Sequence, residues 1–396
     1  MRENWTYKKL GEVATFKRGL TYSGKDEVSF SENVVLRSNN IDLATNTLNL
    51  DELKYISSDI CIPEDKKLKA NSIFMCMSNG SKQHLGKVAF IEHDMSYAFG
   101  GFMGLIIPEK EKICPKYLYF YFCSPQFKDV LSSIGNGANI NNIKFVDIAK
   151  YSINIPSLSE QQSIVFELDK INELISQKKA QLSDLDSLAQ SIFYDMFGDP
   201  IENEKGWEVK KLGEVTTFIN GDRGKNYPSQ DDFVDKGVPF INAGHIKASK
   251  IDFVSMNFIT EDKYKTLNSG KIMDGDILFC LRGSLGKRAI VKGIAQGAIA
   301  SSLVIIRCND VNNQYLFHYL GSSFISSCIY KSNNGSSQPN LSATSVSRYI
   351  IPLPPLSLQQ DFAKRIELIE QQKAQISSTI KDLETLLASR MQYWFD

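Results

Sequence analysis

A few stretches of the chain contain residue types that carry out chemistry in other proteins. Gly80-Ser-Lys-Gln-His-Leu-Gly-Lys87 has the outline of a phosphate-binding loop, but it has five residues between its glycines instead of four, and Val88 instead of Ser or Thr. Glu261-Asp-Lys263 could end a nuclease Glu-x-Lys motif, yet the first half of the chain has no counterpart. The sequence also contains no Asn-Pro-Pro-Tyr or Asp-Pro-Pro-Tyr motif for adenine methylation. We therefore expect no catalytic residues and no cofactor in this chain.

The cysteines and histidines also give no indication of a metal site or a disulfide framework. The seven cysteines are odd in number and form no Cys-x-x-Cys pair, and none of the four histidines lies at ligand spacing from them. Neither a disulfide framework nor a metal site is predicted. The N-terminal residues lack the apolar core of a signal peptide, and no uncharged stretch is apolar enough to span a membrane. We expect a cytoplasmic protein with no membrane partner.

The net charge is zero, because 45 basic and 45 acidic residues cancel, but the distribution is uneven. Residues 66–87 contain lysines and no carboxylate, and so do residues 277–309 with their arginines and lysines. Such windows predict local basic surface, which suits a nucleic-acid partner despite the neutral total.

Three pairs of loops are rich in the side chains that contact base edges in duplex DNA. Arg and Lys favour guanine, and Asn and Gln favour adenine. Such loops also form ordinary turns, so each one is a candidate and not an assignment. The candidate DNA-contacting residues are Arg37, Asn39, Asn40, Lys82, Gln83, Lys87, Asn136 and Asn139 in the first half of the chain, and Asn242, His245, Lys247, Arg282, Lys287, Arg288, Asn333, Asn334 and Gln338 in the second.

An internal repeat determines the predicted architecture. The segment from Trp5 to Gly19 recurs from Trp207 to Gly221 with ten identities in fifteen positions. Further matches follow in the same order, ending with Tyr151–Gln162 against Tyr349–Gln360. A period near 200 residues is too long for a solenoid, so the chain is predicted to be two homologous domains. Short apolar runs between Gly, Asn, Ser and Pro indicate mixed α/β modules.

Each copy is followed by a long amphipathic segment. Apolar residues recur at heptad spacing from Ile164 to Met196 and from Phe362 to Trp394, which predicts a coiled coil. The first helix ends close to the start of the second domain, so the second helix must run back along the first. The two helices should therefore pair antiparallel, with the domains related by a pseudo-two-fold axis. About 38 residues at roughly 1.5 Å each span on the order of 55 Å.

Several of these motifs together resemble a known family. The stretch Phe197-Gly-Asp-Pro200, followed by Gly206-Trp207, and the repeated Ile155-Pro156-x-Leu158-x-x-Gln161-Gln162 are similar to the specificity subunits of type I restriction-modification systems. The resemblance covers the whole chain. It implies a DNA-specificity subunit whose two target recognition domains each recognise one half of an interrupted duplex target. The implied partners are double-stranded DNA, two adenine methyltransferase subunits and the restriction subunits, which supply the chemistry.

This interpretation divides the chain into five parts. They are target recognition domain 1 (1–158), coiled-coil helix 1 (159–198), a linker (199–206), target recognition domain 2 (207–356) and coiled-coil helix 2 (357–396). The alternative is a coiled-coil scaffold whose domains bind protein, and it leaves the two windows without acidic residues unexplained. A self-sufficient nuclease or methyltransferase lacks the necessary motifs.

Overall fold

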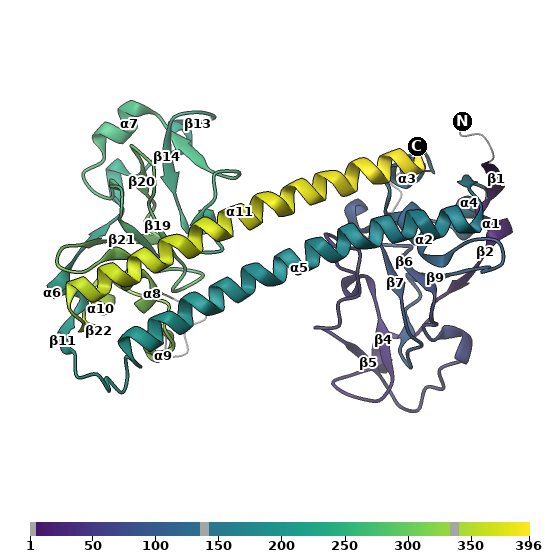
Figure 1. Cartoon of the computed structure of the whole chain (residues 1–396), viewed down its shortest axis with the longest axis horizontal. Coiled ribbons are helices and arrows are strands. Elements are labelled where there is room, and N and C mark those ends of the chain that lie inside the picture. The colour runs from purple at the N-terminus through teal and green to yellow at the C-terminus, as the bar shows by residue number, and fades with distance from the viewer. Residues whose placement is uncertain (1–4, 135–141, 333–339) are drawn as a thin grey trace. The chain divides into compact units, whose positions relative to one another are not determined.

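The computed structural model describes residues 5–134, 142–332 and 340–396. The chain forms two compact units. Unit 1 comprises the residues up to Lys179 together with Ser378–Asp396, and unit 2 comprises Ala180–Ser377. Two long helices, α5 (Leu158–Phe197) and α11 (Leu356–Phe395), each contribute residues to both units (Figure 1).

Unit 1 contains two four-stranded sheets and one two-stranded sheet among its described residues. The strand orders are β2-β9-β6-β7, β3-β5-β4-β8 and β1-β10. The strands are β1 (Thr6–Lys9), β2 (Ala14–Arg18), β3 (Glu27–Val28), β4 (Val34–Leu36), β5 (Lys54–Ile56), β6 (Ser72–Cys76), β7 (Val88–Ile91), β8 (Ala98–Phe99), β9 (Met103–Pro108) and β10 (Ser152–Ile155). The short helices are α1 (Leu10–Val13), α2 (Pro115–Cys123), α3 (Pro125–Ile134) and α4 (Phe145–Ala149).

Unit 2 repeats this plan, with sheet orders β12-β21-β18-β19, β13-β17-β14-β20 and β11-β22, and adds the small hairpin β15-β16. Its strands are β11 (Glu208–Lys211), β12 (Thr216–Asn220), β13 (Phe233–Val234), β14 (Val238–Ile241), β15 (Ile246–Lys247), β16 (Lys250–Ile251), β17 (Asn257–Ile259), β18 (Ile277–Cys280), β19 (Arg288–Ile290), β20 (Ala298–Ile299), β21 (Leu303–Cys308) and β22 (Ile350–Leu353). Its short helices are α6 (Leu212–Val215), α7 (Glu261–Thr266), α8 (Asn313–Tyr319), α9 (Ser323–Ser332) and α10 (Ala343–Ser347). The predicted mixed α/β class and tandem repeat are confirmed.

Strand β6 in the sheet β2-β9-β6-β7, and its counterpart β18 in the sheet β12-β21-β18-β19, are buried on both faces. In β6, Ile73 and Met75 join the core beneath α2, while Phe74 and Cys76 join the core shared with the second sheet. In β18, alternate residues divide between two cores in the same way. Side chains alternate across a strand, so a continuous apolar run is what a strand covered on both faces requires.

The long helices pair antiparallel within each unit. In unit 1, early residues of α5 meet late residues of α11: the Arg390 Nη2 lies 3.0 Å from a Glu167 carboxylate oxygen, which also accepts from the Trp394 indole at 3.0 Å. In unit 2, late residues of α5 meet early residues of α11: Lys373 Nζ lies 2.7 Å from Asp186, and the Phe197 and Phe362 rings are 5.2 Å apart. The antiparallel pairing predicted from the heptads is confirmed.

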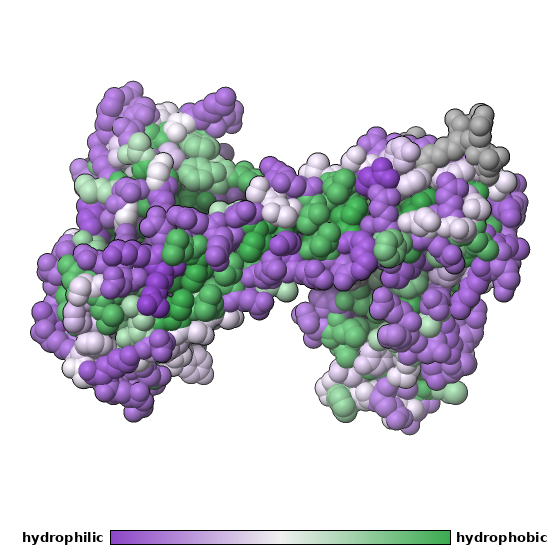
Figure 2. All heavy atoms as spheres, in the orientation of Figure 1, coloured by the Kyte–Doolittle hydropathy of each residue, from purple (hydrophilic) through white to green (hydrophobic). Residues whose placement is uncertain are grey.

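Both helices keep some large apolar side chains exposed outside this seam. Figure 2 shows hydrophilic residues over much of both units and apolar residues gathered along the long helices. They include Phe166, Leu174 and Leu188 on α5 and Leu368 and Leu386 on α11. Among the residues that the structure describes, no helix has the length and apolar composition needed to cross a membrane.

Candidate nucleic-acid interface

In both units, segments distant in the sequence meet at the C-terminal end of one strand, β6 in unit 1 and β18 in unit 2. We call the residues after this strand the strand-end loop, 77–86 in unit 1 and 281–286 in unit 2. In unit 2, the Leu341 N–H donates to the Leu281 carbonyl at 2.9 Å, and Arg282 forms a β-bridge with Asn340. In unit 1, Ile143 donates to Met77 at 2.7 Å, and Ser78 bridges to Asn142. The same backbone frame therefore carries Ser78 in one unit and Arg282 in the other.

A second predicted loop joins this frame through side-chain contacts. In unit 1, the Asn79 side-chain amide donates to the Ser38 hydroxyl at 2.9 Å, which connects the strand-end loop to the turn after β4. In unit 2, the Ala243 N–H in the turn after β14 donates to the Ser302 hydroxyl at 3.3 Å, and the Ser302 carbonyl accepts from the Leu281 N–H of the strand-end loop at 2.9 Å. The structure thus brings the described parts of the predicted loops together at one end of each domain.

Five of the predicted residues have exposed side chains there. No hydrogen bond or ion pair of these side chains lies within the described ranges 5–134, 142–332 and 340–396. They are Asn39, Lys82, Gln83, Arg282 and Lys287.

Arg37 and Asn242 are half-buried. The buried Nε of Arg37 has no hydrogen-bond partner among the described residues. The Asn242 side chain accepts from the Gly244 N–H at 2.8 Å and so stabilises its own turn.

Asn40 and His245 occupy equivalent positions and hold the turns together. Asn40 is 1% exposed, its side-chain oxygen accepts from the Arg37 N–H at 2.8 Å, and its amide donates to two backbone carbonyls. His245 is 4% exposed, and its Nδ1 accepts from the Asn242 N–H at 3.1 Å. Burial lowers the pKa of His245, so its ring is neutral at pH 7 and can accept this bond. Both side chains therefore form hydrogen bonds within the protein that stabilise their turns.

Two of the predicted cations are also engaged inside the domains. Lys87 is a predicted DNA-contacting residue, but it is 7% exposed, and its Nζ donates to the Ile41 carbonyl at 2.8 Å. Burial lowers the pKa of Lys87. Arg288 donates from Nε to the Phe317 carbonyl at 2.7 Å, stacks on the Phe317 ring, and has its pKa lowered to about 10 by burial. Both cations therefore donate to backbone carbonyls of their own domain.

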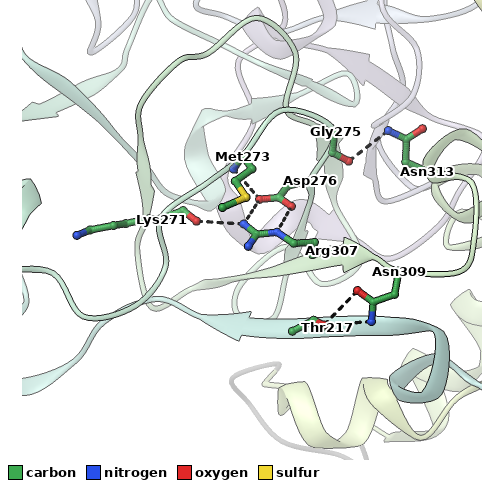
Figure 3. Close-up of polar contacts among 8 residues, drawn as sticks. All are labelled: Thr217, Lys271, Met273, Gly275, Asp276, Arg307, Asn309 and Asn313. Carbon is green, nitrogen blue, oxygen red and sulfur yellow. Dashed lines mark hydrogen bonds and ion pairs between the residues drawn. The ribbon is translucent and has the colours of Figure 1, made fainter.

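Residues 66–87 and 277–309 contain no acidic residue, but several of their basic side chains form ion pairs with acidic residues outside these two windows. Lys67 pairs with Glu64 at 2.9 Å, just outside the first window. In the second window, Arg307 forms a bidentate ion pair with the buried carboxylate of Asp276, with both N···O distances at 2.8 Å (Figure 3). Lys247 in β15, outside both windows, pairs with Asp252 at 2.6 Å. The exposed, uncompensated basic residues are therefore fewer than the windows suggested.

A polar cavity of about 470 Å³ opens beside Arg282 in unit 2. The described residues that line it include Arg223, Asn220 and Asn340, and none of these described residues is acidic. Arg223 was missed by the sequence analysis. Its position just after β12 could have indicated that it lies near Arg282, because β12 and β18 run parallel and end at the same edge of the sheet. Arg223 is exposed and lines this cavity together with Arg282, while the carboxylate of the adjacent Asp222 accepts from two backbone N–H groups.

Some predicted residues cannot be placed. Asn136, Asn139, Asn333, Asn334 and Gln338 lie outside the described residues. Within residues 5–134, 142–332 and 340–396, no three His, Cys, Asp or Glu side chains are grouped so that they could hold a metal ion.

Comparison with known proteins identifies the family. The model of the type I restriction modification DNA specificity domain matches residues 2–184 and again residues 204–385. The chain belongs to this family and carries two copies of its domain. It is therefore a type I specificity subunit, and the predicted resemblance is confirmed over the scaffold alternative.

Individual relatives of the chain are also type I specificity subunits. The specificity subunit of the type I restriction enzyme EcoKI from Escherichia coli K12 is 25% identical over 389 residues, covering 92% of this chain and 82% of the relative. The MjaIX specificity subunit from Methanocaldococcus jannaschii is 26% identical over 304 residues, covering 72% and 69%. A chain of a solved type I R-M system matches with a TM-score of 0.59 at 17% identity, covering 99% of this chain and 97% of that one. The S subunit from M. genitalium gives 0.55 at 15%, covering 99% and 96%.

Proposed function

We propose that residues 1–158 and 207–356 are target recognition domains, and that each recognises one half of an interrupted duplex DNA sequence at its strand-end loop. The observation that carries the proposal is the shared frame: both domains fix the same backbone segments by equivalent bonds, from Ile143 to Met77 and from Leu341 to Leu281. A rigid frame with variable side chains suits sequence recognition, because base contacts depend on side-chain type and placement.

The differences between the frames support two unlike half-sites. The bridged position is Ser78 in domain 1 and Arg282 in domain 2. The strand-end loop of domain 1 is also four residues longer and carries Lys82 and Gln83 on an exposed 3₁₀ turn. Arginine suits guanine and glutamine suits adenine, so we propose that the two domains recognise different bases. Arg223, Asn39 and Lys287 complete the proposed contact set.

We further propose that the chemistry belongs to partner subunits: two adenine methyltransferase subunits and, for cleavage, the restriction subunits. The exposed apolar side chains on α5 and α11 support a helix surface that protein partners cover. The contacts of the Glu-x-Lys-like tripeptide support a structural role for it. It forms the first turn of α7, capped by Thr260, and Lys263 pairs with Asp232 at 3.3 Å. The free thiols of all seven cysteines support a working place in the reducing cytoplasm.

Methylation assays with purified components test this proposal. The chain alone should transfer no methyl group and hydrolyse neither DNA nor ATP, and its mixture with the methyltransferase should methylate one interrupted sequence. Light scattering of the complex should give two methyltransferase copies per chain. Turnover by the chain alone, or methylation without sequence preference in the complex, would overturn it.

A further inference from the structure

Two buried glutamines make the same pair of contacts at the start of the two long helices. In unit 1, Gln161 accepts from the Cys114 N–H at 2.7 Å through Oε1 and donates from Nε2 to the Pro156 carbonyl at 2.9 Å. It is 1% exposed.

The second copy in unit 2 repeats this geometry. Gln359 accepts from the Asn312 N–H at 2.8 Å and donates to the Pro354 carbonyl at 2.8 Å. It is 2% exposed. The corresponding distances differ by only 0.1 Å between the two units, so the same joint is present in both copies of the repeat.

Each glutamine joins three parts of its domain. Cys114 and Asn312 are the N-cap residues of α2 and α8, whose N–H groups have no partner inside their own helices. Pro156 and Pro354 directly follow β10 and β22. The side chain therefore connects the end of a strand, the start of a domain helix and the first turn of α5 or α11.

Only a side chain with both a donor and an acceptor can make this joint. A glutamate could not donate to the proline carbonyl, and an apolar side chain could do neither. Apolar packing also holds the helices, through Leu168 in unit 1 and Ile366 in unit 2. That packing is non-directional, whereas hydrogen bonds are directional. The amide is thus the part of the joint that fixes orientation rather than attachment.

We propose that Gln161 and Gln359 are positioning residues that lock the orientation of each target recognition domain on its long helix, and thereby restrict the complex to one spacer length. This rests on the proposed function for its DNA readout. One base pair more or fewer moves a half-site by about 3.4 Å and turns it by about 35°. A domain locked on its helix cannot follow that rotation, and a loosened one can.

The chain supplies matched controls in the neighbouring glutamines. Gln162 and Gln360 are exposed and lie one residue further along the same helices. The test compares Gln161→Met and Gln359→Met with Gln162→Met and Gln360→Met, each in the full chain with its methyltransferase. Methionine keeps the unbranched shape of glutamine and removes both hydrogen bonds.

The readout is the set of methylated adenines in cells, sorted by spacer length. Wild type and the two controls should methylate a single spacer. Gln161→Met and Gln359→Met should methylate sites with one base pair more or fewer at least about tenfold more often, with unchanged half-site sequences. An unchanged single spacer in both buried variants would overturn the proposal.

Amide hydrogen exchange of the purified full chain tests the joint without DNA. In Gln161→Met, the peptide containing Cys114 should exchange about tenfold faster than in wild type or Gln162→Met, while the peptide containing Asn312 stays unchanged. Unchanged exchange at Cys114 would refute the joint. If wild type methylates no interrupted sequence but exchange changes as expected, the proposed function fails and the joint stands. Should Gln161→Met not fold, Gln161→Glu keeps the acceptor and must still loosen the Pro156 contact.

Discussion

Arg282 is the residue on which the recognition proposal can be tested most sharply. Its side chain is exposed and makes no ion pair within the described residues, while its backbone is fixed on both sides. The Cys280 thiol donates to the Arg282 carbonyl at 3.0 Å, and Leu341 donates to Leu281 at 2.9 Å. Arg282→Ala therefore removes a guanidinium from a frame that stays in place, and we expect no change in thermal stability.

The size of the effect follows from the value of one bidentate contact to guanine. Such a contact is worth about 1 to 3 kcal/mol of discrimination, or about 5- to 150-fold. In the methylated sequences of cells carrying Arg282→Ala, one base position of one half-site should lose its preference by that factor. The other half-site should not change, because the first domain is intact.

Lys287→Ala is the matched control, since Lys287 is exposed on the same loop end. If it contacts phosphate, affinity should fall evenly across sequences, and the slope of log K against log salt should decrease by about 1. Relaxation of both half-sites by Arg282→Ala would refute the assignment of one domain to one half. No change at any position would remove Arg282 from the contact set.

Three further variants test the residues that the structure places inside the domains. Arg288→Ala should lower the free energy of unfolding by about 1 to 3 kcal/mol, through loss of the Phe317 contacts, and leave the methylated sequence unchanged; a stable variant with an altered target would contradict this. Lys87→Met should leave both half-sites unchanged in methylome sequencing, since the Nζ is buried against a backbone carbonyl, so a shifted preference would show that it reaches DNA. Burial lowers the pKa of His318 to about 4, so the unfolded chain takes up a proton at this residue at a higher pH than the folded chain does. The free energy of unfolding should therefore fall by up to about 3 kcal/mol as pH falls from about 6.5 toward 4. Denaturant titrations at pH 7 and pH 5 should show this extra acid sensitivity in wild type and not in His318→Phe, which carries the residue found at Phe120 in the first domain.

The architecture could be predicted from the sequence because it depends on patterns that extend over many residues. The repeat from Trp5 and Trp207 required two similar domains. The heptads and the short link after Phe197 required antiparallel helices, and the Glu167 and Asp186 contacts confirm them. Each inference used many positions at once, so no single exception could reverse it.

The candidate site was harder to predict from the sequence, because it depends on which side chains come into contact in the folded chain. Arg307 lies in a window without acidic residues, yet Asp276, one residue outside that window, neutralises it. Lys87 and Arg288 have the right residue type for DNA contact, but the fold turns both toward backbone carbonyls. Arg223 was missed because its closeness to the Arg282 loop appears only when β12 and β18 are seen to end together.

A chain with two copies of the first domain would test the central claim most directly. Residues 207–356 would be replaced by residues 5–158, with both long helices retained, and adenine methylation would be sequenced in cells that also carry the methyltransferase. If two identical domains take the pseudo-two-fold arrangement that the sequence predicts, they should recognise an interrupted palindrome, with the first half-site of the wild-type target on both sides. Methylation of the unchanged wild-type sequence by this chain, or of a sequence containing neither half-site, would contradict the assignment of one half-site to each domain.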